Sequence, residues 1–236
     1  MSLESTDREA DRVGPAGEAA VLVAIQSAVT RPATVSAARA LSHFGEHSLG
    51  WLALAGAGAL VAARRGDETA RRRYLEAGAG AFGAHAASVI IKRIVRRPRP
   101  NHPDISVGVG TPSKLSFPSS HATSTTTAAI LLGWALAAGS GASGADGLAA
   151  GSGASGADGL AAGSGVSGAS RRWRNPATLT AVIVPPMLLS RLVLGVHYPT
   201  DVLAGAAIGA ASAGAVIAGD KLMGDRLFAN RKPGVS

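Results

Sequence analysis

A chain of 236 residues is long enough for one domain, and this one is 47% hydrophobic but only 4% aromatic. Its apolar residues are mostly Ala, Gly, Leu and Val, which suits closely packed membrane helices better than a soluble core. It has no cysteine, which excludes disulfides and thiolate metal sites, and its net charge of +8 comes from basic clusters between apolar runs, which argues against a nucleic-acid-binding face.

The first 44 residues contain no stretch long enough to cross a bilayer. Residues 1–14 are polar, carry four acidic residues and predict a disordered tail without a cleavable signal peptide. Residues 17–30 are apolar but shorter than the ~20 residues that a spanning helix needs. After an Arg-Pro pair, residues 33–44 continue as an amphipathic helix. We therefore expect residues 15–44 to form helices that lie at the membrane interface or are half inserted.

Five later apolar stretches predict spanning helices, and the fold class is then an all-α, polytopic membrane bundle. The stretches are 48–63, 74–91, 120–138, 176–196 and 200–219. Several are short and contain polar residues, so they should pack against each other rather than face lipid on all sides. Gly205 and Gly209 have the spacing that lets helix backbones approach closely. The pair Pro185-Pro186 should kink or locally break the fourth helix.

Residues 139–170 differ in composition from the rest of the chain. The twelve residues GSGASGADGLAA at 139–150 recur unchanged at 151–162, and a fragment of the unit follows. Two copies of a Gly/Ser/Ala unit cannot bury a core, so we expect a flexible linker. This linker divides the membrane domain into two parts and leaves a cytoplasmic tail; the three segments are 45–138, 171–222 and 223–236.

Basic residues in the loops predict the orientation of the helices. They cluster in the loop at 64–73, in the segment after the repeat, and in the C-terminal tail. With five spans these regions share one side, which should be cytoplasmic because basic loops tend to stay inside. Residues 92–119 and 197–199 then lie on the outer, periplasmic face of the plasma membrane. Three tryptophans near span ends fit interfacial anchors: Trp51, Trp134 and Trp173.

The first segment suited to a phosphate ester is KRIVRRPRP at 92–100, with Lys92, Arg96, Arg97 and Arg99. A phosphoryl group in transfer carries negative charge, and cations must be placed in advance to meet it. The prolines fix an extended stretch that can fold Arg99 back toward Lys92. Taken alone, such a run is more typical of a juxtamembrane basic stretch that touches lipid headgroups.

The second segment is PSSH at 118–121, just before an apolar run. A serine in that place predicts an N-cap. The helix that it starts would direct its free backbone amides toward an anion. His121 falls in the first turn, where it could reach that anion, although a histidine that bonds only to its own cap is the alternative.

The third segment, SRLVLGVHYPTD at 190–201, is the most specific. Pro199 fits the first turn of a helix. Asp201 follows His197 by four residues, so its carboxylate can accept the proton of one imidazole nitrogen and leave the other free to attack. The helix dipole also favours an Asp in a first turn. That alternative explains Asp201 alone, and not its neighbours Arg191 and His197.

Other ionisable residues are given smaller roles. His85 and Glu76 lie in an apolar span, and we expect them to make packing or polar contacts. Three histidines are expected at the surface or the interface: His43, His47 and His102. In the outer loop, Asp104 and Lys114 could touch a substrate.

Taken in order, the three segments resemble the signature of the type 2 phosphatidic acid phosphatase family: K-x6-RP, PSGH and SR-x5-H-x3-D. Ser120 stands where the family usually has glycine. The resemblance implies a helical membrane phosphatase without a metal or another cofactor. It implies that His197 attacks phosphorus to form a phosphohistidine, that Asp201 orients it, and that His121 protonates the leaving alkoxide. By the same resemblance the phosphate is held by Lys92, Arg99, Arg191 and the amides near Ser119 and Ser120. Apart from the resemblance, Arg96 and Lys114 are possible substrate contacts.

Four longer segments resemble a branch of that family which removes the 5-phosphate from a polyprenylphosphoryl phosphoribose, on the way to the donor for cell-wall arabinan; they are 40–51, 89–103, 109–126 and 189–205. The motifs read the phosphate and not its bearer, so polyprenyl diphosphate, phosphatidic acid and phosphatidylglycerol phosphate stay open as substrates. A soluble vanadate-dependent haloperoxidase has similar motifs but does not need spans this apolar. The alternative of another class is a non-catalytic membrane protein that binds anionic lipid. The oligomeric state is not indicated.

Overall fold

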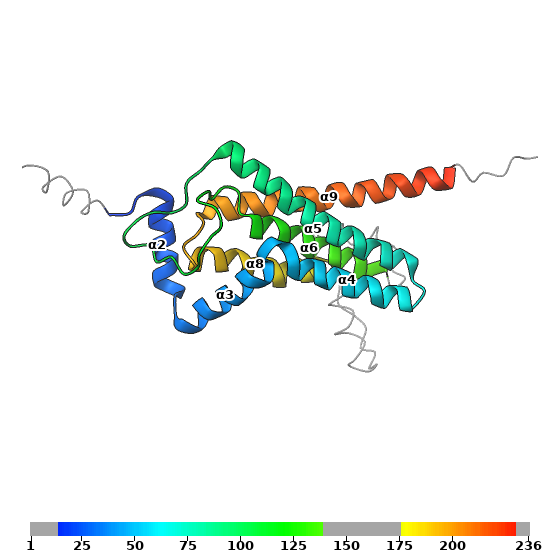
Figure 1. Ribbon diagram of the computed structural model, residues 1–236, viewed down its shortest axis with the longest axis horizontal. Helices are drawn as coiled ribbons and strands as arrows, with labels where there is room; N and C mark the ends of the chain where they lie inside the picture. The colour runs from blue at the N-terminus through cyan, green and yellow to red at the C-terminus, as the bar shows by residue number, and fades with distance from the viewer. Residues whose placement is uncertain (1–13, 139–175, 230–236) are drawn as a thin grey trace, which may run out of the picture.

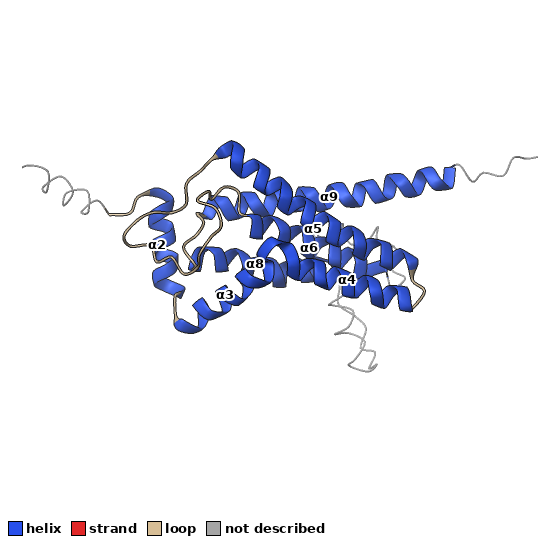
Figure 2. Ribbon diagram, viewed as in Figure 1, coloured by secondary structure: helices blue, strands red, loops and turns tan. Residues whose placement is uncertain are grey.

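The computed structural model describes residues 14–138 and 176–229 (Figures 1 and 2). Within these ranges the chain consists of helices and loops, and the expected all-α class is confirmed. The helices are α2 (Gly17–Val29), α3 (Pro32–Gly45), the short 3₁₀ helix η1 (Glu46–Ser48), α4 (Leu49–Arg64), α5 (Glu68–Val95), α6 (Ser120–Ala138), α8 (Pro176–Val193) and α9 (Pro199–Ala229). The expected N-terminal tail, the repeat at 139–170, Trp173 and the last residues lie outside the described residues.

Five helices form a bundle in which α4, α5, α6, α8 and α9 run alongside one another (Figure 1). Because α5 and α8 end where α6 and α9 begin, the loop 96–119 and the turn 194–198 meet at one end of the bundle (Figure 1). We call this the loop end. The turn between α4 and α5 lies at the opposite end, and α2 lies across the loop end (Figure 1). All three motif segments therefore lie at the same end.

The central helix α6 begins with a run of Ser and Thr and is buried on nearly all sides, where it packs against α5, α8 and α9. Two of its threonine hydroxyls bond to backbone carbonyls. Thr123 Oγ1 donates to Ser119 O at 3.0 Å, and Thr127 Oγ1 donates to Thr123 O at 2.9 Å and to Gly209 O at 3.0 Å. These bonds satisfy the hydroxyls of Thr123 and Thr127 inside the core, whereas the buried hydroxyls of Ser124, Thr125 and Thr126 make no hydrogen bond.

The expected close approach of α6 and α9 is present at Gly205 and Gly209. A Cβ atom at Gly205 would lie 2.6 Å from Ser119 O, and one at Gly209 would lie 2.4 Å from Thr123 O. Both distances are too short for any side chain. The two glycines thus keep the start of α9, which carries Asp201, against the start of α6.

We expect Gly209→Ala to destabilise the fold by about 1–3 kcal/mol, because the added methyl group forces α6 and α9 apart. Gly214→Ala is the matched control on the same helix, since nothing lies within 4 Å of its added Cβ. Thermal unfolding in detergent measures both variants. Equal melting temperatures for Gly209→Ala and Gly214→Ala would contradict the close contact.

The five expected spans are all helical, but not all meet a simple criterion for crossing a membrane. Among the described residues one helical segment is long and apolar enough, Pro199–Met223, with a mean hydropathy of 1.8. Of the others, α4 is short, α5 begins with charged residues, and α6 begins with a run of Ser and Thr. The helix α8 is continuous through Pro185 and Pro186, so of the expected kink or break the break is absent.

Two of the tryptophans expected as interfacial anchors are instead core residues. Trp51 is 4% exposed and Trp134 is 7% exposed, and both belong to the main apolar cluster of the bundle. Trp51 packs edge-on against Phe44, with ring centroids 4.8 Å apart, and the Arg73 guanidinium lies 4.3 Å from the Trp134 ring centroid. Because half of the buried residues in this cluster are alanines, these large side chains supply bulk that the core needs.

Candidate active site

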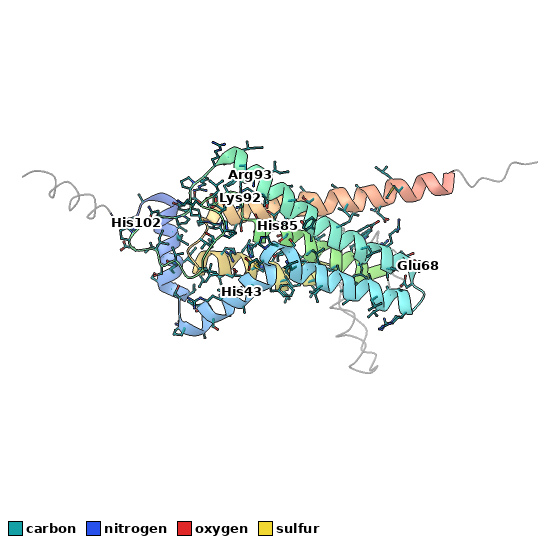
Figure 3. All side chains as sticks on the ribbon, viewed as in Figure 1. His43, Glu68, His85, Lys92, Arg93 and His102 are labelled. Carbon is teal, nitrogen blue, oxygen red and sulfur yellow. The ribbon has the colours of Figure 1, made fainter. Side chains whose placement is uncertain are left out.

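Lys92 is buried at the C-terminal end of α5, at the loop end, whereas Glu68 begins the same helix at the opposite end (Figure 3). Its ammonium group donates to Ser116 O at 3.0 Å and to Pro118 O. Arg96 terminates α5 in a left-handed conformation with φ of 55°. The chain can therefore turn back over the end of the helix, and Lys92 holds the loop that leads into α6.

Arg99 lies in the loop that turns back over the end of α5, as we expected from the neighbouring prolines. Its Nε donates to Ser113 O at 2.8 Å, and its Nη1 donates to Val196 O at 2.5 Å. The same Nη1 lies 3.4 Å from Nε2 of His197. Burial lowers the pKa of Arg99 to about 10, so the guanidinium stays charged at neutral pH.

Arg191 and His197 flank a tight turn at the end of α8. Gly195 has φ of +66°, and a Cβ there would lie 2.3 Å from Ser106 O, so the turn requires glycine. Arg191 and His197 are each only 2% exposed. The Arg191 Nη1 atom donates to Ser42 Oγ at 2.8 Å, which ties the end of α8 to α3.

The two ring nitrogens of His197 face different partners. Nε2 faces Arg99, while Nδ1 lies 3.7 Å from Oδ2 of Asp201. Asp201 is fully buried in the first turn of α9. Its Oδ2 accepts the backbone N–H of Tyr198 at 2.8 Å, and its Oδ1 accepts Arg97 Nη1 at 3.0 Å. A proton on Nδ1 would face the carboxylate and leave the lone pair of Nε2 directed toward the cations.

Burial holds the pKa of His197 well below its usual value, and the charges of Arg99, Arg191 and Lys92 lower it further. The imidazole is therefore neutral at physiological pH, the form that can attack phosphorus. The three cations that disfavour its protonated form are also those that suit a phosphate dianion. A neutral imidazole surrounded by cations is an arrangement that suits phosphoryl transfer.

His121 sits in the first turn of α6 and is bound to α3. Its Nε2 lies 3.0 Å from Ser42 O, and the hydroxyl of the same Ser42 accepts Arg191. The structure therefore brings His121 and Arg191 together at one residue. His121 belongs to the cluster, with its ring held at the junction of α3 and α6.

The two serines of the second motif differ in their roles at the start of α6. Ser119 caps α6, since its Oγ accepts Ala122 N at 3.4 Å, which agrees with the N-cap signal. However, the Ser119 amide donates to Asp201 O at 2.9 Å. The first-turn amides that α6 can direct at an anion are then those of Ser120 and His121.

A family model described as the PAP2 superfamily matches residues 73–221, which is more than half of the chain. The chain belongs to the PAP2 superfamily. The membership predicted from the three motifs is confirmed, and the match includes all of them.

Two named relatives match most of the chain. A protein of Mycolicibacterium smegmatis is 53% identical over 192 residues, covering 81% of this chain and 82% of its own. One of Mycobacterium tuberculosis is 50% identical over 197 residues, covering 83% and 86%. Both are named decaprenylphosphoryl-5-phosphoribose phosphatase.

The fold is also that of a solved PAP2 structure. A transmembrane PAP2-type phosphatidylglycerolphosphate phosphatase from Bacillus subtilis matches with a TM-score of 0.59 at 20% identity, covering 86% of this chain and 85% of that chain. The arrangement of the helices is therefore shared with a transmembrane member of the superfamily.

Two cations predicted as substrate contacts lie outside the cluster, by which we mean the group formed by Lys92, Arg99, His121, Arg191, His197 and Asp201. Arg96 is exposed, and its Nε donates to Arg93 O at 3.1 Å, so it caps α5. Lys114 is also exposed, and only its carbonyl takes part, accepting Arg99 N at 3.2 Å. The basic residue that joins the PAP2 motif residues is Arg97, which binds Asp201.

Residues of the N-terminal helices also reach the site, and the sequence reasoning gave them no role. Ser42 comes from α3. From α2, Gln26 Nε2 donates to Ser106 O at 2.8 Å and to Val193 O at 3.1 Å, and its Oε1 accepts Ser106 N at 3.0 Å. Gln26 thereby fastens the loop 96–119 to the end of α8. A long polar side chain in an otherwise mostly apolar helix was the available signal.

Proposed function

We propose that this PAP2 protein is an integral-membrane phosphomonoesterase that removes the 5-phosphate from a polyprenylphosphoryl phosphoribose. The observation that carries the phosphatase assignment is the convergence of Lys92, Arg99 and Arg191 around His197, with His121 held beside Arg191. The substrate assignment is supported by two relatives of at least 50% identity that are named for the decaprenylphosphoryl-5-phosphoribose reaction.

The reaction proceeds in two displacements at phosphorus. In the first, Nε2 of His197 attacks, the bond between phosphorus and the ribose 5-oxygen breaks, and His121 gives a proton to that oxygen. In the second, water attacks the phosphohistidine, the phosphorus–nitrogen bond breaks, and inorganic phosphate leaves while a proton returns to His121. Asp201 stabilises the imidazolium form of His197 between the two steps.

The phosphate is held throughout by residues from three elements of the loop end. Lys92, Arg99 and Arg191 supply the positive charge, and the first-turn amides of α6 supply neutral donors. These cations neutralise the equatorial oxygens, so the proposed reaction needs no metal ion. The isoprenoid tail stays in the bilayer beside the bundle.

The active site faces the outer, periplasmic side of the plasma membrane in this proposal. Arginines at the opposite end of the bundle support this orientation, because Arg64 and Arg65 lie at the end of α4 and Arg71 lies in the first turn of α5, on either side of the turn seen in Figure 1. Substrate and membrane lipids are the partners that the proposal requires.

Purified protein in detergent, given synthetic polyprenylphosphoryl 5-phosphoribose, should release inorganic phosphate, and release should persist in excess EDTA. Phosphatidylglycerol phosphate, phosphatidic acid and polyprenyl diphosphate serve as the comparison substrates. We expect the phosphoribosyl lipid to have the highest kcat/KM. Hydrolysis of polyprenyl diphosphate with the phosphoribosyl lipid untouched would contradict the substrate assignment, and loss of activity in EDTA would contradict the metal-free mechanism.

A further inference from the structure

Arg97 occupies a central position at the loop end. Its Nη1 donates to Asp201 Oδ1 at 3.0 Å and to Thr200 Oγ1 at 2.7 Å, and its guanidinium carbon lies 4.3 Å from the Tyr198 ring centroid. The side chain therefore packs across the first turn of α9. It binds Oδ1 of Asp201, whereas Oδ2 is the oxygen that faces His197.

Glu18 of α2 binds the other side of Arg97. Its Oε2 accepts Arg97 Nη2, and its Oε1 accepts the backbone N–H of Thr200 at 2.9 Å and the Thr200 hydroxyl at 2.7 Å. Hydrogen bonds from Thr200 and Arg97 lower the pKa of Glu18 although burial alone would raise it, so the carboxylate stays charged. The ion pair and the Thr200 bonds join α2 to the start of α9.

The charges along this chain of contacts alternate. Asp201 is fully buried, so a neighbouring cation acts strongly on it. Arg97 alone would cancel the negative charge that Asp201 presents to His197. Glu18 opposes Arg97, and the three groups together keep one net negative charge beside the imidazole.

The same contacts also fix the orientation of the Asp201 carboxylate. A carboxylate bound at Oδ1 by Arg97 and at Oδ2 by the Tyr198 amide cannot rotate, and its Oδ2 is held 3.7 Å from His197 Nδ1. A small movement of the imidazole during attack would bring this pair within hydrogen-bond distance.

We infer that Arg97, held by Glu18, is a positioning residue that sets the orientation and the effective charge of Asp201 toward His197. The inference rests on the proposed phosphatase function. According to this inference, α2 is part of the active site, because Glu18 in its first turn is the first of the linked groups that continue through Arg97 and Asp201 to His197.

Several charged groups surround His197 and enter its titration. Lys92 comes from α5, Arg99 from the outer loop, Arg191 from α8, His121 from α6, and Asp201 from α9. Arg97 and Glu18 act through Asp201. Only these last two can be changed without removing a residue proposed to touch the phosphate or the imidazole.

Two substitutions should move the pKa of His197 in opposite directions. Arg97→Met frees the charge of Asp201 to favour the imidazolium, so the pKa of His197 rises and the acid limb of kcat/KM moves to higher pH. Glu18→Gln leaves Arg97 unopposed, so the pKa falls and the acid limb moves to lower pH. Both should lower kcat about 10-fold or more with little change in KM, because the substrate is not touched.

The experiment records pH profiles of phosphate release for Arg97→Met, Glu18→Gln and Arg97→Lys, with Arg93→Met as the control. Arg93 is an exposed arginine at the end of α5 (Figure 3). Arg97→Lys should restore the acid limb but recover only part of kcat, since an ammonium group lacks the planar fork. Histidine NMR titration of the free variants reads the same pKa shifts without any turnover.

The inference is overturned if Arg97→Met and Glu18→Gln leave the His197 titration and the acid limb unchanged, or shift both the same way. Reduced melting temperature with kinetics equal to Arg93→Met would also overturn it, since Arg97 would then be only a structural ion pair. Wild-type protein that releases no phosphate would overturn the proposed function, while the NMR titration would still decide whether Arg97 and Glu18 tune His197.

Discussion

His197→Ala is expected to lower phosphate release at least about 10⁴-fold, because the variant has no nucleophile to form the covalent intermediate. The loss should fall on kcat, since Lys92, Arg99 and Arg191 still bind the phosphate. Steady-state release from the phosphoribosyl lipid, with tight binding of inorganic vanadate or phosphate as a second readout, measures the two effects separately.

His43→Ala is the matched control, since His43 is a solvent-exposed histidine of α3 and lies outside the cluster. It should retain wild-type activity. A His197→Ala protein that is folded and still turns over at a rate near wild type would contradict the assigned nucleophile. If wild type binds anionic lipid but releases no phosphate, the protein is a lipid-binding protein and not an enzyme.

His121→Ala is expected to produce a loss that depends on the leaving group. The ribose 5-oxygen leaves as a strongly basic alkoxide and needs a proton, so we expect a loss of about 10²–10⁴-fold with the lipid substrate. A nitrophenyl phosphate leaves as a weakly basic phenolate and needs little help. With that substrate the first displacement should be nearly as fast as in wild type, as seen in the burst of nitrophenol.

The ratio of the two losses separates catalysis from structure. His121 also contacts Ser42, so removing its side chain could loosen α3, but loosening would slow both substrates alike. Equal losses with the sugar phosphate and the aryl phosphate would contradict the role of general acid. A Ser42→Ala variant, which keeps the carbonyl bound to His121, should not show the leaving-group dependence.

The sequence predicted most of the elements that form the site, because apolar periodicity and motif spacing are local properties. The N-cap at Ser119 and the first-turn position of Pro199 lie where local rules place them. Chain reversal through successive helices then requires that Lys92 and His197 meet at one end. The PAP2 membership followed from these same residues.

The sequence did not predict what depends on tertiary packing. Arg96 and Arg97 are adjacent and chemically identical, and only the left-handed end of α5 decides that Arg97 turns inward. The contacts of Glu18 and Ser42 join segments separated by about 80 residues or more. Trp51 was misplaced because a position near a helix end indicates an interface only when the side chain faces lipid.

The most direct measurement is to stop the reaction within the first turnover and to map the phosphorylated residue by mass spectrometry under conditions that preserve phosphohistidine. We expect phosphate on His197, accumulating further in variants of His121, and phosphate release with overall retention of configuration at phosphorus. Phosphate found on another residue, or inversion of configuration with His197 unmodified, would show that this imidazole is not the group that attacks.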